Sequence, residues 1–90
     1  MPPLPVVELF SKPDCHLCEE AKSLLQELRA THAFLLREVN ITTDATLYAR
    51  YGEEIPVVCI NGRKAFKYRI DSRQFVRHLQ RAYRAPDASG

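Results

Sequence analysis

Residues 6–28 read VVELFSKPDCHLCEEAKSLLQEL, and the spacing of their apolar residues changes at Cys15 from that of a strand to that of a helix. Residues 6–10 are apolar and β-branched enough for a buried strand, and the loop at residues 11–14 stops it. After Cys15, apolar residues recur at steps of three and four while charged residues fill the other face, which predicts an amphipathic helix. The stretch therefore predicts a strand, a tight loop and a helix that begins at Cys15.

The rest of the chain predicts three more strands and two more helices. In chain order they are strand 34–41, short helix 42–51, strand 55–60, strand 63–69 and last helix 71–83. Asn61-Gly62 is a strong hairpin signal between the last two strands, and Gly52 ends the short helix. Asp71, with Gln74 three residues on, resembles a capping box for the last helix.

The resulting order is βαβαββα. Each strand-helix-strand passage predicts a right-handed parallel crossover, and the hairpin adds an antiparallel edge. We therefore expect an α/β fold of three layers with a mixed four-stranded sheet. Ninety residues allow one domain with a modest core, which we assign to residues 1–85, with residues 86–90 as a disordered tail.

Composition and charge exclude several classes of protein. No apolar run approaches the roughly 18 to 20 residues of a membrane-spanning helix, and the N-terminus lacks a secretory signal pattern. Three cysteines are too few, and an odd number, for a disulfide-stapled secreted scaffold. The isoelectric point near 8.5 lies below that of a strongly basic nucleic-acid-binding domain. We expect a cytoplasmic monomer without membrane or nucleic-acid partners.

The chemistry is concentrated in Cys15-His16-Leu17-Cys18, which follows a strand and opens a helix, the context of a redox pair. Residues three apart within a regular helix keep their Cβ atoms about 5 to 6 Å apart, whereas a disulfide needs roughly 3.5 to 4.5 Å. Cys15 must therefore lie at the half-in N-terminal position, where the N–H groups of Leu17 and Cys18 and the helix dipole favour its thiolate. This predicts Cys15 as the nucleophile. Cys18 is expected to be the buried, protonated resolving thiol.

Two other interpretations of the pair stay open. Half of a zinc site would need further ligands, and only Cys59, His16, His32 and His78 remain, without a second paired motif. Alternatively, both cysteines are helix-cap and core residues without chemistry. Cys59, in the middle of an apolar strand, is expected to be structural, and we expect no metal site.

Three segments together resemble the glutaredoxins of the thioredoxin-fold superfamily. They are Ser11-Lys12-Pro13-Asp14-Cys15-His16-Leu17-Cys18, Ile55-Pro56-Val57-Val58 and the Asn61-Gly62 hairpin. More closely, the chain looks like the small glutaredoxin-like proteins with a Cys-His-Leu-Cys motif. The resemblance implies a reactive Cys15, a resolving Cys18 and a cis Ile55–Pro56 bond facing them, although residue statistics alone favour trans. It also implies that the Ile55 backbone pairs with an extended substrate and that Lys12 lies near a glutathione carboxylate.

The chain departs from the pattern of dithiol glutaredoxins at two places. It has His16-Leu17 where they have Pro-Tyr, and Arg69-Ile70 before the last helix where they have Gly-Gly. A glycine pair lets a peptide approach the backbone closely, and these two side chains obstruct that approach. Asp71 and Ser72 remain at the helix start, where N–H groups can meet a carboxylate. Glutathione is therefore only a candidate co-substrate, and no other cofactor is expected.

These observations predict a thiol-disulfide oxidoreductase that reduces protein or low-molecular-weight disulfides through Cys15 and Cys18. A thioredoxin or glutathione reductase system is the expected source of electrons. The alternative is a thioredoxin-fold binding module without turnover, which holds a metal or an iron-sulfur cluster or docks a partner. A basic stripe on the last helix is expected to be a solvated face, with docking of an acidic partner as its functional alternative. The stripe consists of Arg73, Arg77, Arg81 and Arg84.

Overall fold

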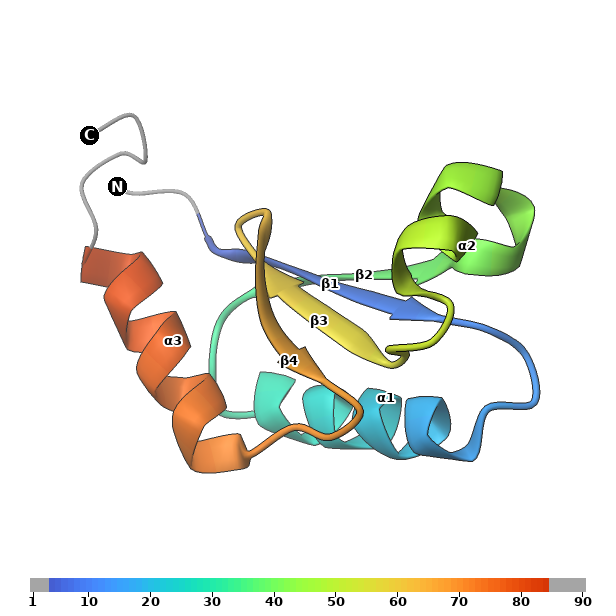
Figure 1. The fold of residues 1–90 in the computed structure, drawn as a ribbon. Coiled ribbons are helices and arrows are strands. Elements are labelled where there is room, and N and C mark those ends of the chain that lie inside the picture. Colours follow the sequence, from blue (N-terminus) through green and yellow to red (C-terminus); the bar gives the residue numbers. More distant parts are fainter. Residues whose placement is uncertain (1–3, 85–90) are drawn as a thin grey trace.

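The computed structural model of the chain describes residues 4–84 and has the expected order of strands and helices. The elements are β1 (Val6–Ser11), α1 (His16–Arg29), β2 (Leu35–Asn40), the 3₁₀ turn η1 (Ile41–Thr43), α2 (Ala45–Tyr51), β3 (Val57–Ile60), β4 (Arg63–Lys67) and α3 (Ser72–Arg84). One four-stranded sheet, in the order β2-β1-β3-β4, has α1 and α3 on one face and α2 on the other (Figure 1). The α/β fold and the mixed sheet are as predicted. The expected tail at residues 86–90 and the expected domain end at residue 85 lie outside the described residues.

The second strand-helix-strand passage is not the parallel crossover that we expected. β2 runs parallel to β1, whereas β3 runs antiparallel to it. β2 ends at Asn40 beside Ser11, and β3 begins at Val57 beside Phe10, so both points lie at the same end of β1. The seven-residue α2, about 10 Å long at 1.5 Å per residue, lies at that end (Figure 1). The prediction was wrong because apolar spacing identifies a helix without giving the direction in which it crosses the sheet.

The larger of two apolar cores lies between the sheet and the helices α1 and α3. Leu9 of β1, Leu25 of α1 and Phe75 of α3 are fully buried in it. The Phe75 ring meets the Phe34 ring edge-on with centroids 5.3 Å apart, a geometry worth about 0.5 to 1.5 kcal/mol beyond burial. This core holds α1 against β1 and so fixes the loop that joins them.

The smaller core lies under α2, on the opposite face of the sheet. The rings of Phe10 and Tyr51 pack at 4.7 Å between centroids, and Ile41 and Val57 are fully buried beside them. Cys59 belongs to the same core and is 3% exposed. Its side chain is therefore part of the packing between β3 and α2, as expected of a structural cysteine.

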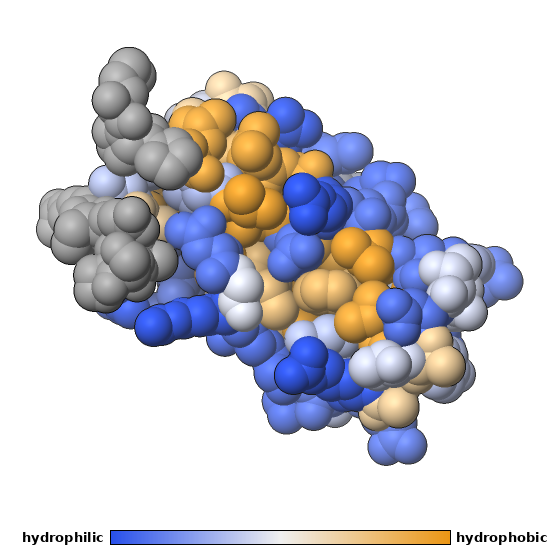
Figure 2. All heavy atoms as spheres, turned by 90° about the horizontal axis from the view of Figure 1, so that it is seen from above, coloured by the Kyte–Doolittle hydropathy of each residue, from blue (hydrophilic) through white to orange (hydrophobic). Residues whose placement is uncertain are grey.

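The face of the molecule on the α2 side is mixed in character. Figure 2 shows hydrophobic residues there in patches that hydrophilic residues interrupt. One of the charged pairs joins β1 to β2, where Glu8 and Arg37 are register partners and approach to 3.7 Å. Within residues 4–84, no helix combines the length and the apolar composition needed to cross a bilayer.

Candidate active site

Cys15 is the N-cap of α1, the position predicted from the spacing of the two cysteines. Its backbone is extended, with φ −109° and ψ 107°, and its sulfur accepts a hydrogen bond from the Cys18 N–H at 3.2 Å. The expected second hydrogen bond, from the Leu17 N–H, is absent from the described part of the chain. Cys15 is partly exposed, whereas Cys18 is 2% exposed. The extended N-cap backbone brings the two Cα atoms to 5.1 Å, and the sulfurs are joined as a disulfide.

The loop between β1 and α1 presents Cys15 at the surface. Pro13 and Asp14 form its turn, and Asp14 adopts a left-handed backbone with φ 61°, which aspartate tolerates better than most residues. Lys12 follows β1 directly and is partly buried. Within residues 4–84 its ammonium group forms no ion pair. Lys12 is therefore available to attract an anionic group to this loop.

His16 follows Cys15 in the chain, and its side chain lies next to the carboxylate of Glu20. Its Nε2 lies 3.0 Å from Oε2 of Glu20, one turn along α1, and the His16 side chain is 87% exposed. A positive charge on His16 would therefore be offset by Glu20 and screened by water. The N-terminus of α1 supplies positive potential to the Cys15 sulfur whatever the charge on His16.

The Ile55–Pro56 bond is cis, as the resemblance to glutaredoxins implied. The two residues precede β3 rather than starting it, and Pro56 is buried. The O of Pro56 accepts a hydrogen bond from the Tyr68 N–H at 2.8 Å. The loop that carries the cis bond is thus tied to the segment that leaves β4.

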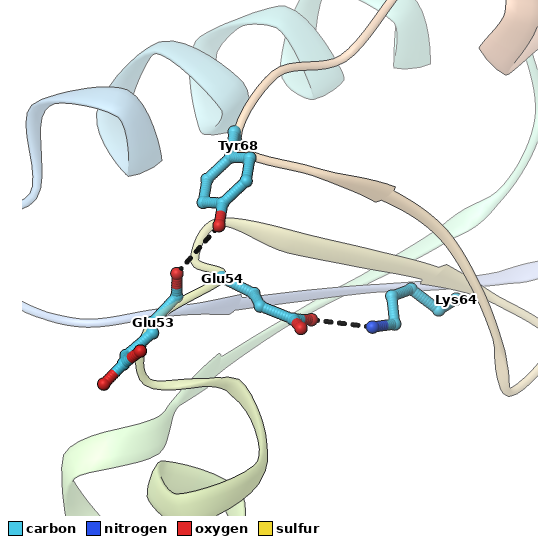
Figure 3. Close-up of polar contacts among 4 residues, drawn as sticks. All are labelled: Glu53, Glu54, Lys64 and Tyr68. Atoms are coloured by element: carbon cyan, nitrogen blue, oxygen red, sulfur yellow. Dashed lines mark hydrogen bonds and ion pairs between the residues drawn. The ribbon is translucent and has the colours of Figure 1, made fainter.

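Two further contacts join the residues before the cis bond to β4 and to the residue that follows it (Figure 3). The Tyr68 hydroxyl donates to the backbone O of Glu53 at 3.0 Å, and Nζ of Lys64 lies 2.6 Å from Oε1 of Glu54. The Lys64 hydrogen bond lowers the pKa of the Glu54 carboxyl and, reciprocally, raises the pKa of the Lys64 ammonium. Together these contacts fix residues 53–56 from three points.

The start of α3 is capped from within the chain. Oδ1 of Asp71 accepts a hydrogen bond from the Gln74 N–H at 3.0 Å, which is one half of the predicted capping box. The Asp71 carboxylate therefore places a negative charge at the helix start. The substrate-binding role expected for Asp71 and Ser72, at this helix start, stays a prediction.

A pocket of about 180 Å³ lies between α1 and the segment after β4, and its first lining residue, Leu17, stands between the two cysteines in the sequence. It is lined by Leu17, Glu20, Ala21, Leu24, Tyr68, Arg69 and Ile70. Arg69 and Ile70, which we expected only to obstruct a peptide, form part of the wall of this pocket. Tyr68 was missed by the sequence reasoning, because no local pattern shows that residue 68 returns to α1.

The remaining candidate metal ligands are dispersed. Cys59 lies in the α2 core, the His78 ring packs edge-on against Phe66, and His32 Nδ1 lies 2.9 Å from Thr31 Oγ1. Over the range 4–84, no three side chains of His, Cys, Asp or Glu gather as metal ligands would. The zinc interpretation of Cys15 and Cys18 therefore lacks a second pair of ligands among these residues.

Comparisons with known proteins identify the family of the chain. Residues 6–80 match the family model described as a glutaredoxin-like domain (DUF836). A glutaredoxin-like protein of Dictyostelium discoideum is 28% identical over 71 residues, which are 72% of this chain and 66% of that protein. This chain thus spans just under two thirds of that relative. An uncharacterized protein of Mycobacterium tuberculosis is 25% identical over 83 residues, which cover 87% of this chain and 86% of that protein.

Solved structures extend the comparison to the fold. A structural genomics target protein from X. campestris is 31% identical, with a TM-score of 0.69 and coverage of 89% of this chain and 99% of that one. A mutant thioredoxin from Halobacterium salinarum, 13% identical, has a TM-score of 0.67 and covers 93% of this chain and 78% of its own. The fold described above is therefore thioredoxin-like.

Proposed function

The chain belongs to the glutaredoxin-like family, and from this premise we propose that it is a thiol-disulfide oxidoreductase that reduces disulfides through Cys15 and Cys18. The observation that carries the proposal is the position of Cys15 at the N-cap of α1, with Cys18 in bonding reach beneath it. The Cys18 N–H and the positive end of the helix stabilise a thiolate on Cys15. Burial of Cys18 favours its protonated thiol until the mixed disulfide on Cys15 has formed.

The reaction has two exchange steps that balance in electrons. The Cys15 thiolate attacks one sulfur of the substrate disulfide, the substrate S–S bond breaks, and the leaving thiolate takes a proton from water. Cys18 then loses its proton and attacks the Cys15 sulfur of the mixed disulfide. This step forms the Cys15–Cys18 bond and releases the second substrate thiol. Two electrons have passed to the substrate, and an external dithiol or glutathione must return them.

The surroundings of Cys15 supply the proposed substrate contacts. Lys12 attracts an anionic group to the loop before Cys15, and the Ile55 backbone, held beside Pro56, pairs with an extended substrate. Arg69 and Ile70 replace the glycine pair of dithiol glutaredoxins, so we expect glutathione to bind more weakly here than it does beside a glycine pair. We expect the protein to work in a reducing cytoplasm, with a thioredoxin or glutathione reductase system as the source of electrons.

A coupled assay tests the proposal. The protein would be supplied with a disulfide substrate and with either thioredoxin reductase plus thioredoxin or glutathione plus its reductase, and NADPH consumption followed. We expect turnover with at least one system, loss of it in Cys15→Ser, and retention in the matched control Cys59→Ala. Turnover by the wild type that does not exceed the Cys15→Ser background with either system would reject the oxidoreductase and favour a binding module.

A further inference from the structure

We propose that the pocket beside Leu17 is a subsite for one apolar side chain of a polypeptide substrate, two residues away from the cysteine that Cys15 attacks. The inference rests on the proposed oxidoreductase function and names its substrate class. The apolar part of the pocket comes from α1 and from Ile70. On α1, Leu17, Ala21 and Leu24 follow one another at steps of four and three and therefore lie on one face of the helix.

The volume of the pocket selects the size of the occupant. Its volume is about 180 Å³, and a cavity of about 150 Å³ is known to hold a benzene ring. Sites for whole small ligands typically measure about 300 to 1,000 Å³. The pocket therefore fits one branched aliphatic or aromatic side chain, rather than a complete small-molecule ligand.

The position of the pocket sets the distance from the reacting cysteine. Along the α1 axis, Leu17 and Leu24 lie about 3 and 13.5 Å beyond the level of Cys15, at 1.5 Å per residue. In an extended substrate that runs along α1, two residues span about 6.6 Å, and residues two apart point to the same side. A substrate side chain two positions from the reacting cysteine therefore reaches the middle of the pocket.

One wall of the pocket is fixed before a substrate arrives. Tyr68 has a left-handed backbone with φ 68°, which is rare for a bulky residue and persists only where surrounding contacts determine it. One of those contacts is the hydrogen bond from its N–H to the O of Pro56. The other is the hydrogen bond from its hydroxyl to the O of Glu53 (Figure 3). The same side chain thus borders the pocket and anchors the loop that carries the cis bond, so a substrate can engage both without rearranging the wall.

The charges at the rim indicate what accompanies the apolar side chain. The carboxylate of Glu20 lies on the α1 side of the rim, 3.0 Å from Nε2 of His16, whereas the exposed Arg69, on the side of the segment after β4, forms no ion pair within residues 4–84. An unpaired guanidinium at the rim favours a carboxylate on the incoming chain. The occupant is therefore a polypeptide with an apolar side chain two residues from its reacting cysteine and an acidic residue beside that side chain.

Short peptides that contain one cysteine, each as a mixed disulfide with 2-mercaptoethanol, test the subsite. The residue two before or two after the cysteine is Gly or Leu, and its neighbour is Glu or Lys. Reduced protein is mixed with each peptide, and the second-order rate constant is measured. At one of the two positions we expect the Leu peptide to react about tenfold faster than the Gly peptide, the low end for an apolar group in a pocket. Replacing Glu by Lys should slow the reaction about threefold at low salt.

A pair of variants locates the effect. In Leu24→Gln the Leu-to-Gly rate ratio should fall to about one, whereas Leu35→Gln, at a 51% exposed leucine on the far edge strand, should keep it. Thermal unfolding checks that both variants fold, and the wild-type peptide series alone decides the question if Leu24→Gln does not. Equal rates for Gly and Leu peptides at both positions would overturn the subsite. Failure to reduce any peptide would instead overturn the proposed function.

Discussion

Cys15 and Cys59 are the same residue type in two regions that give them opposite chemistry. Cys15 caps a helix, is partly exposed and receives an N–H hydrogen bond on its sulfur. Cys59 lies in β3 beneath α2, and burial raises the pKa of its thiol. The pKa of Tyr51, in the same core, is also raised by burial. The helix terminus thus favours a thiolate and the core favours a neutral thiol, so on our proposal the position in the fold decides which cysteine is reactive.

The largest expected difference between the two regions is in alkylation. In the fully reduced protein at pH 7, iodoacetamide should modify Cys15 at least about a hundredfold faster than Cys59, because thiolate content and exposure both favour Cys15. Cys59 should react only through opening of the core. Mass spectrometry of the peptides gives the rates. Faster modification of Cys18 than of Cys15 would exchange their roles as nucleophile and resolving thiol.

The free energy of unfolding should depend more on Cys59 than on Cys15. Cys59→Ser puts a hydroxyl into the α2 core and should lower the free energy of unfolding by about 1 to 3 kcal/mol. Cys15→Ser, compared with wild type under reducing conditions, should stay within about 0.5 kcal/mol because serine is itself a good N-cap residue. Urea denaturation measures both. A larger loss for Cys15→Ser than for Cys59→Ser would contradict the assignment of the two regions.

The burial of Cys59 should also make the free energy of unfolding depend on pH in the alkaline range, as a smaller effect. The folded state raises the pKa of Cys59 above its unfolded value of about 8.5, so this contribution to stability is complete below that pH. It is lost as pH rises toward the folded pKa, and Tyr51 adds a similar loss at higher pH. We expect the free energy of unfolding of the oxidised protein to fall above about pH 8.5. The fall should be shallower in Cys59→Ala. An unchanged dependence of the free energy of unfolding on pH in this variant would show that Cys59 does not cause the fall.

The smallest change in stability is expected for the exposed arginines of α3. Arg73, Arg77 and Arg81 are exposed on α3, and reversing the charge of Arg77 and Arg81 should change the free energy of unfolding by no more than about 0.5 kcal/mol. The rate toward a neutral small disulfide should not change. A slower, less salt-sensitive reaction with an acidic protein substrate would show instead that this face docks partners.

Local patterns were sufficient for the parts of the molecule that depend on neighbours in sequence. The N-cap position of Cys15 follows from the geometry of residues three apart, and the core position of Cys59 follows from the apolar run around it. The antiparallel direction of β3 did not follow, because it depends on where the chain re-enters the sheet. Tyr68 and the pocket beside Leu17 also escaped prediction, since segments about fifty residues apart meet there only in the folded chain.

Trapping the mixed disulfide tests the central claim most directly. Reduced Cys18→Ser protein would be mixed with a peptide disulfide, quenched with acid and mapped by mass spectrometry. The account predicts that a peptide adduct accumulates on Cys15, because the residue that should displace it is absent, while Cys15→Ser forms none there and leaves Cys59 unmodified. An adduct that accumulates on Cys18 in Cys15→Ser, with none on Cys15 in Cys18→Ser, would contradict the claim that the helix-capping cysteine is the nucleophile.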